Sequence, residues 1–198
     1  QISKTRFFAA ASHDLLQPLN AARIFASTLA EQRDLSNSSQ HAVRRIDRAL
    51  RDAEEVIDVL VGVAKLDTGA VKTVIEEINL QELLIAITDQ FSAIAERRNL
   101  QLRIGPCKII VRSDRKLLRR LLQNLLSNAL RYTANGGVLV GVRRLPGAQI
   151  RIDVVDTGPG VVHEAIPHIF EEFRRGGHNS PWGEKGLGLG LAICKRIC

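Results

Sequence analysis

An imidazole, a carboxylate and a proline stand close together near the start of the 198-residue sequence, in the stretch ASHDLLQPLN. His13 and Asp14 are adjacent, and Pro18 follows within one and a half turns of helix. The apolar residues around them recur at alternating spacings of three and four from Phe8 to Leu29, which predicts an amphipathic helix. On that register His13 lies opposite the apolar stripe and faces water. An exposed imidazole is mostly neutral near pH 7, so one ring nitrogen is free to act as a nucleophile.

Two asparagines interrupt a later apolar run, LLQNLLSNAL. Asn124 and Asn128 are four residues apart, so they share one face of a helix. Buried amides without partners are costly, and these two therefore either bond neighbouring backbone or face a polar ligand. An amide oxygen suits Mg²⁺, which prefers oxygen ligands and bridges substrate phosphates. Arg131, one turn further on, is placed to reach a phosphate, and Tyr132 is placed to flank a base.

A third candidate group, DTGPG, follows an alternating strand pattern. The carboxylate of Asp156 at the end of that strand is suited to accept a hydrogen bond from the exocyclic amine of adenine. Gly158 and Gly160 permit a turn that lies tightly against a flat ligand. The pentapeptide alone is equally typical of an ordinary turn.

A fourth group, GEKGLGLGL, places glycines at alternate positions before a predicted helix. Backbone N–H groups at Gly186, Gly188 and Gly190, next to Lys185 and a helix N-terminus, would form an anion cradle. It is neither a Walker loop, because no Gly-Lys-Ser/Thr follows, nor a Rossmann turn, because no strand precedes it. The polar, glycine-rich segment 174–186 predicts a lid over a bound nucleotide.

Two domains are expected to position these residues. Residues 1–68 form a helical hairpin, since a second stripe runs from Val43 to Ala64 after the polar turn 32–39. Two such hairpins bury all four stripes, which predicts a homodimeric four-helix bundle. Residues 69–198 form an α+β two-layer sandwich with helices on one face of a mixed sheet. Its helices are expected at 80–98, 115–133, within 157–173 and from 188, and its strands after 69 and at 100–105, 108–114, 136–145 and 149–156.

The composition narrows the partners. The net charge of +7 comes largely from arginines dispersed over many segments, and aromatics are only 4%, which favours an acidic partner or a nucleotide over nucleic acid. No run is long and apolar enough for a membrane span, so any membrane contact belongs to segments outside the sequence. Cys107, Cys194 and Cys198 lack metal-ligand spacing and are expected to be packing residues in a reducing cytoplasm.

In this order and spacing the motifs resemble the H, N, G1, F and G2 boxes of sensor histidine kinases. The matching stretches are SHDLLQP, QNLLSNALRYT, DTGPG, IFEEF and GLGLGL, so the resemblance covers nearly the whole chain. The stretch ASHDLLQPLN is most similar to that of soluble or hybrid sensor kinases of bacteria. The resemblance implies a dimerisation and histidine phosphotransfer domain followed by an ATP-binding domain of the Bergerat type. The family fold normally continues beyond its last glycine box, so we expect further chain after Cys198.

The resemblance also implies roles for individual residues. His13 is the phospho-acceptor, with Asp14 orienting its ring; Asn128 holds Mg²⁺ with help from Asn124; and Asp156 recognises the adenine of ATP. The glycine loops line the nucleotide, and Phe170 and Phe173 either anchor the base of the lid or pack in the core, or do both. The phosphoryl group would pass to an aspartate of a response-regulator receiver domain.

Gln17 departs from the family pattern, because many relatives have Thr or Asn there. This argues against phosphatase activity, although the Gln17 amide could still position a water molecule. Two other functions remain open at this point. One is a dimeric pseudokinase scaffold, and the other is a non-signalling Bergerat ATPase such as a topoisomerase or chaperone subunit.

Overall fold

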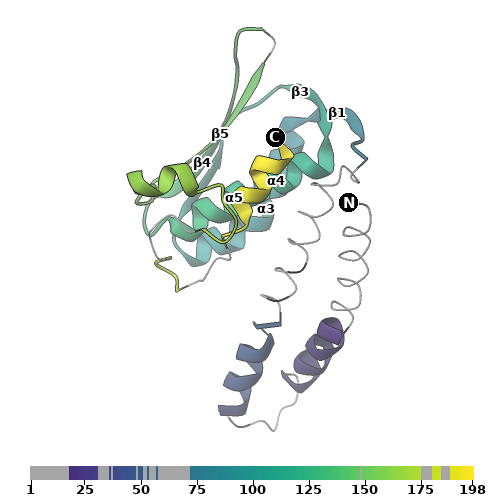
Figure 1. Ribbon diagram of the computed structural model, residues 1–198, viewed down its shortest axis with the longest axis vertical. Coiled ribbons are helices and arrows are strands. Elements are labelled where there is room, and N and C mark those ends of the chain that lie inside the picture. The colour runs from purple at the N-terminus through teal and green to yellow at the C-terminus, as the bar shows by residue number, and fades with distance from the viewer. Residues whose placement is uncertain are drawn as a thin grey trace. The chain divides into compact units, whose positions relative to one another are not determined.

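The computed structural model describes residues 18–30, 36, 38–47, 49–50, 53, 57, 72–147, 149–174, 180–183 and 188–198. The chain divides into two compact units, Gln1–Lys72 and Thr73–Cys198 (Figure 1). The sequence analysis placed this boundary after residue 68. The described part of the first unit is helical over 18–30 and, with a gap at 48, from 38 to 50.

The two helices of the first unit keep apolar side chains on their surfaces. Ala26 and Val43 are buried, whereas Phe25 and Ile46 are 73% and 51% exposed. Ser36 begins the second helix, since its Oγ accepts the N–H of Ser39 at 3.2 Å. The hairpin therefore retains uncovered apolar surface of the kind that a second hairpin would bury, and the homodimer stays a prediction.

The second unit contains five strands and four helical segments among its described residues. They are β1 (Ile75–Asn79), α3 (Leu80–Arg97), β2 (Gln101–Ile104), β3 (Ile110–Asp114), α4 (Arg115–Tyr132), β4 (Gly137–Arg144), β5 (Ile150–Asp156), the 3₁₀ helix η1 (His163–His168) and α5 (Gly190–Ile197). Each lies within or close to a range predicted from periodicity.

Both long helices begin at a side-chain cap that also ends a strand. Asn79 Oδ1 accepts the N–H groups of Gln81 and Glu82 at the start of α3. Asp114 accepts the N–H groups of Lys116 and Leu117 at the start of α4, and that of Val74 beside β1. The hydrogen bond from the Leu117 backbone, followed by that from Val74, lowers the pKa of Asp114.

The strands form two sheets and not the single mixed sheet that the sequence suggested. β1 pairs antiparallel with β3, while β4 lies between a parallel β2 and an antiparallel β5. β2 and β3 do not pair across Gly105–Pro106, because the connection between them bonds to other elements. Gly105 N–H donates to Val140 O, and Cys107 N–H donates to Gln81 Oε1 at the start of α3. With the connection held by these bonds, β3 pairs with β1 and not with β2.

The core lies between the three-stranded sheet and the helices, which confirms the predicted two-layer sandwich. Val138 and Val140 of β4 are buried against Leu122 and Leu126 of α4 and the apolar face of α3. α5 packs against α4 (Figure 1). Because side chains alternate along β4, Leu139 lies on the opposite face of the sheet, where it is 47% exposed.

Candidate functional site

The two asparagines of α4 face the first turn of α5. A Cβ placed on Gly190 would lie 3.7 Å from Asn128 Nδ2 and 3.8 Å from Asn124 Cγ and Oδ1. Leu189, the residue before α5, makes no side-chain capping bond, so no cap side chain satisfies the first N–H groups of this helix. The structure thus brings together two amides, a glycine and an uncapped helix N-terminus from segments far apart in the sequence.

The side-chain amide nitrogen of Asn124 is buried. Its Nδ2 atom is inaccessible to water and meets no acceptor in good hydrogen-bond geometry among the described residues, although the amide lies close enough to the Cys194 thiol to affect its pKa. Buried polar atoms are normally satisfied, so this amide nitrogen is an exception in the packing of α4.

Cys194 of α5 lies in the same region. Burial, followed by the charge of Cys198, raises the pKa of the Cys194 thiol to about 11, and the Asn124 amide acts in the opposite direction. The thiol donates a long bond to Leu121 O at 3.8 Å. Cys107 and Cys194 are buried, as expected for packing residues, but Cys198 is exposed because α5 carries it beyond the core.

Asp156 reaches the site from the end of β5. It pairs with Val138 across the β4–β5 ladder, and directly opposed residues point to the same face of a sheet. Val138 is 2% exposed and points into the core, so Asp156 projects on the helix side of the sheet. Its Oδ1 accepts the N–H of Gly158 at 2.8 Å, which fixes the carboxylate while leaving it exposed.

Gly158 is required by a close approach within the chain. A Cβ there would lie 2.8 Å from Asp156 Oδ1 and 3.1 Å from Tyr132 O at the end of α4. The sequence had suggested close approach to a ligand, and the structure adds contact with the chain itself. Gly160 has a φ of +74° and open space around it, so it serves the turn conformation.

The sequence analysis gave no role to Thr157, whose hydroxyl joins two loops beside the site. Its Oγ1 donates to Asn135 O at 2.8 Å and accepts the N–H of Gly137 at 3.0 Å. These bonds tie the loop after β5 to the loop between α4 and β4. A Cβ on Gly136 would overlap Thr157 Oγ1, so the Gly136–Gly137 pair is the signal that could have indicated this contact.

Glutamate side chains make the hydrogen bonds found at the base of the predicted lid, and the two phenylalanines there are exposed. Phe170 and Phe173 are 43% and 60% exposed, so neither packs in the core. Glu171 bonds both His168 and Arg174, at 2.7 and 3.1 Å. The hydrogen bond with His168 is the main cause that lowers the pKa of Glu171.

Two further contacts join residues before and after the predicted lid segment. Glu172 accepts a 2.7 Å bond from Arg196 of α5. Gly188 has a φ of +72°, and a Cβ on it would overlap the carbonyl oxygen of Arg174. The two ends of the segment between Arg174 and Gly188 therefore meet.

Other site residues divide into those that the structure places and those that it does not describe. Arg131 and Tyr132 are half-buried in the last turn of α4, next to the loop after Asp156. His13, Asp14, Gln17, Lys185 and Gly186 lie outside the described residues.

Comparisons with known proteins match both parts of the chain. Residues 113–198 match the family described as "Histidine kinase-, DNA gyrase B-, and HSP90-like ATPase", and residues 3–69 match the "His Kinase A (phospho-acceptor) domain". The order of these two matches, phospho-acceptor domain before ATPase domain, decides the assignment. The chain has the two domains of a sensor histidine kinase catalytic core.

Individual relatives share both parts of the kinase core. The chain is 30% identical over 198 residues to the alginate biosynthesis sensor protein KinB of Pseudomonas aeruginosa, covering 98% of this chain and 33% of KinB. It also resembles the structure of full-length ShkA in complex with AMPPNP, with a TM-score of 0.79 and 26% identity over 97% of this chain and 40% of ShkA. A complex of the histidine kinase ThkA with the response regulator protein TrrA shares the fold, with a TM-score of 0.65 and 21% identity over 98% of this chain and 54% of that chain.

The chain corresponds to only part of each of these relatives. The chain spans from 33% to 53% of the length of the first four curated relatives that it matches. The matched descriptions name a phospho-acceptor domain in the first part of the chain and an ATPase domain in the second. Within the described residues, no helix combines the length and hydropathy that a bilayer crossing demands.

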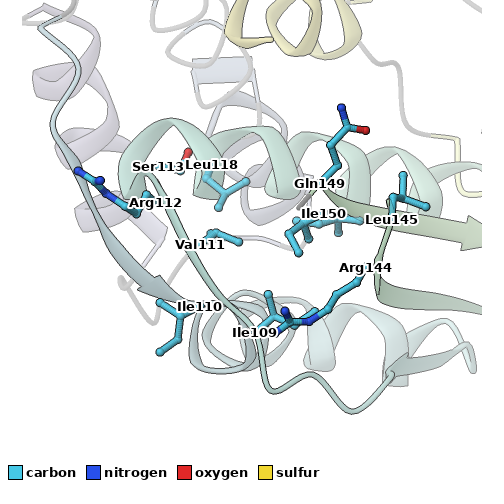
Figure 2. A pocket seen from close by; sticks show the side chains of 11 residues that line it. Ile109, Ile110, Val111, Arg112, Ser113, Leu118, Arg144, Leu145, Gln149 and Ile150 are labelled. Atoms are coloured by element: carbon cyan, nitrogen blue, oxygen red, sulfur yellow. The ribbon is translucent and has the colours of Figure 1, made fainter. Parts of the chain in front are cut away.

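A separate cavity of about 780 Å³ lies in the second unit, away from the residues described above. Figure 2 shows its side chains gathered between β3, the beginning of α4 and the β4–β5 turn, with Val111, Leu118 and Ile150 among them. Leu118 is about 15 Å along α4 from Asn128, at the helical rise per residue. Ile150 is about 20 Å along β5 from Asp156. The cavity is thus distinct from the cluster around Asn124, Asn128 and Asp156.

Proposed function

We propose that this core binds ATP between α4, the loop after β5 and the start of α5, and transfers the terminal phosphoryl group to His13. The observation that carries the proposal is the meeting of Gly190 with Asn124 and Asn128, beside an uncapped helix N-terminus. The match to an ATPase family and the likeness to a kinase complexed with AMPPNP support the choice of nucleotide.

The base would be recognised at the end of β5. The exposed carboxylate of Asp156 is held by the Gly158 N–H and accepts from the exocyclic amine of adenine. Adenine offers this donor where guanine presents a carbonyl oxygen, so the carboxylate selects for adenine. Tyr132, one turn beyond Asn128, would flank the base.

The phosphates would lie at the amide cluster. Asn128, assisted by Asn124, would hold Mg²⁺ through amide oxygens, which are ligands that this ion accepts. No group of three or more His, Cys, Asp or Glu side chains in the described part of the chain is placed to hold a metal ion, so the amides are the better candidates. Mg²⁺ supplies neutralisation of phosphate charge when bound. The N–H groups at Gly188 and Gly190, with Arg131, would stabilise the remaining charge, and Lys185 and Gly186 would complete the cradle.

Transfer would use His13 as the nucleophile. A lone pair on one ring nitrogen forms the N–P bond, the bond from phosphorus to the β–γ bridging oxygen breaks, and ADP leaves. Asp14 accepts the hydrogen bond of the other ring N–H and stabilises the positive charge that develops on the ring. The phosphoryl group would then pass to an aspartate of a receiver domain, a step that the solved complex of ThkA with a response regulator protein supports.

Incubation with γ-labelled ATP tests the proposal. We expect label that is stable to alkali, labile to acid, and absent from His13→Gln. Asn128→Ala should lose both label and nucleotide binding. Gln123→Ala should retain them, because the Gln123 amide lies on another face of α4, where it donates to Gln90 of α3.

Two results would contradict the kinase. Nucleotide binding without label on the wild-type chain would indicate the pseudokinase scaffold. Steady phosphate release that persists in His13→Gln would indicate the non-signalling ATPase.

A further inference from the structure

The C-terminal end of α4 is held by side chains from two distant segments. The last carbonyl oxygens of a helix have no partners within it. Arg98, the residue that caps α3, donates from its guanidinium to Leu130 O at 3.0 Å. Ser180 Oγ donates to Arg131 O at 3.0 Å, and Trp182 Nε1 donates to Thr133 O at 3.1 Å. Carbonyls that would otherwise be open to water are therefore occupied by the chain itself.

The two segments also contact each other. The guanidinium carbon of Arg98 lies 5.1 Å from the centroid of the Trp182 ring, within the range of a cation–π interaction. The backbone N–H of Trp182 donates to Ser180 Oγ at 3.2 Å, so residues 180–182 form a turn that presents both donors together. Trp182 is 36% exposed, which places it on the surface and outside the core.

This cluster is next to the proposed nucleotide site. Thr133, which accepts the indole N–H, directly follows Arg131 and Tyr132. The carbonyl oxygen of Tyr132, between those bound by Ser180 and Trp182, is the one that Gly158 approaches. The end of α4 is thus positioned from one side by Arg98 and Trp182 and from the other by the loop after Asp156.

We propose that Arg98 and Trp182 are positioning residues for nucleotide binding. By fixing residues 180–183 on the end of α4, they keep Arg131, Tyr132 and Gly158 at the spacing that the nucleotide needs. They act through α4 and make no contact with the nucleotide themselves. This proposal rests on the proposed ATP site.

The sequence offers a way to test it without labelling the protein. Trp182 is the single tryptophan of the chain, so its fluorescence reports on this contact alone. Titration of the wild-type chain with AMPPNP should change that fluorescence to saturation, at the same dissociation constant that calorimetry gives. An unchanged emission at saturating AMPPNP would contradict the coupling of Trp182 to the site.

Three variants and a matched control measure the effect. Trp182→Phe keeps a ring over Arg98 but removes the indole donor, Arg98→Ala removes the guanidinium, and Arg98→Lys keeps its charge without the planar fork. Arg97→Ala is the control, because Arg97 bonds only to Ala93 of its own helix among the contacts seen. Loss of one hydrogen bond or one exposed cation–π contact should weaken AMPPNP binding about three- to tenfold.

The effect should fall on affinity and not on chemistry. We expect the KM for ATP to rise by the same factor, while kcat for labelling at saturating ATP stays within about twofold, as for loss of binding that is uniform in ground and transition states. Arg98→Ala combined with Trp182→Phe should weaken binding by less than the product of the two single effects, because the residues share one cluster. Equal loss of kcat in all variants would overturn the positioning role.

The outcomes separate this proposal from the one on which it rests. If the wild-type chain binds no adenine nucleotide, the ATP site itself is wrong. If the wild type binds, Asn128→Ala does not, and the Arg98 and Trp182 variants bind as tightly as Arg97→Ala, the ATP site stands and the positioning role fails. Thermal unfolding of each variant shows whether the fold is retained, and Arg98→Lys provides the test should Arg98→Ala unfold.

Discussion

Replacing Gly158 by alanine should weaken ATP binding more than it weakens the fold. The added methyl group would lie 2.8 Å from Asp156 Oδ1 and 3.1 Å from Tyr132 O. To restore van der Waals distance the carboxylate oxygen must move by about half an ångström or more. The Tyr132 carbonyl belongs to the backbone of α4, whose end is fixed by bonds from Arg98 and Trp182. The Asp156 side chain is the part that can rotate away.

The magnitudes follow from which group yields. Crowding of this kind costs about 1 to 3 kcal/mol, and relief through an exposed side chain places Gly158→Ala at the lower end, about 1 kcal/mol. The displaced carboxylate would lose the charge-assisted hydrogen bond that we propose it makes to the adenine amine. A bond of that type contributes about 1.5 to 3 kcal/mol, which corresponds to about ten- to hundredfold in the dissociation constant.

Calorimetric titration with AMPPNP and with its guanine counterpart measures both affinity and base preference, and urea unfolding measures stability. Gly158→Ala should lose affinity for the adenine nucleotide and most of its preference over guanine. Gly141→Ala is the neutral control, since a Cβ there meets nothing within 4 Å. Gly160→Ala should lose about 1 to 2 kcal/mol of stability through its left-handed φ and keep the base preference. Undiminished adenine preference in Gly158→Ala would refute the role given to Asp156.

Three other outcomes are expected. Hydrogen bonds from the start of α4 lower the pKa of Asp114, so its contribution to stability is complete above the unfolded pKa near 3.8 and is lost as the pH falls below that value. The difference in urea midpoint between wild type and Asp114→Asn should therefore shrink at low pH, and a constant difference would contradict this. Cys194, with a pKa of about 11, should react with thiol reagents at pH 7 far more slowly than exposed Cys198, and equal rates by mass spectrometry would be inconsistent with its burial. Phe25→Asp should dissociate the predicted dimer in sedimentation experiments without unfolding the chain, while Ser27→Asp should not; a wild-type monomer at all concentrations would show the dimer prediction to be wrong.

Local patterns predicted most of the second unit. The 3.6-residue periodicity gave α3 and α4 almost to the residue, and Asn79 and Asp114 mark their beginnings as capping residues do. The four-residue spacing of Asn124 and Asn128 predicted a shared face, and the structure adds that this face meets Gly190. These features depend on neighbours in the chain and are therefore visible in one sequence.

What escaped prediction depends on contacts between distant segments. β3 pairs with β1 because the side chain of Gln81 and the backbone of Leu80 bond the connection before it, and no local signal announces such a bond. Phe170 and Phe173 look like core residues by type, yet they lie on a segment fixed at the surface by Glu171. Arg98 was one of many arginines until its position over Trp182 singled it out.

The pairing of Asp156 with Val138 carries a consequence for how substrate choice could be lost. Side chains alternate along a strand, so sliding β5 by one position against β4 would turn Val155 toward the helices and Asp156 toward solvent on the far side. Such a chain would conserve every residue of the site and most of its secondary structure. On the proposed role of Asp156, it would nevertheless offer a methyl group where adenine needs an acceptor, and the alignment of two neighbouring strands would then help to determine which nucleotide this domain takes.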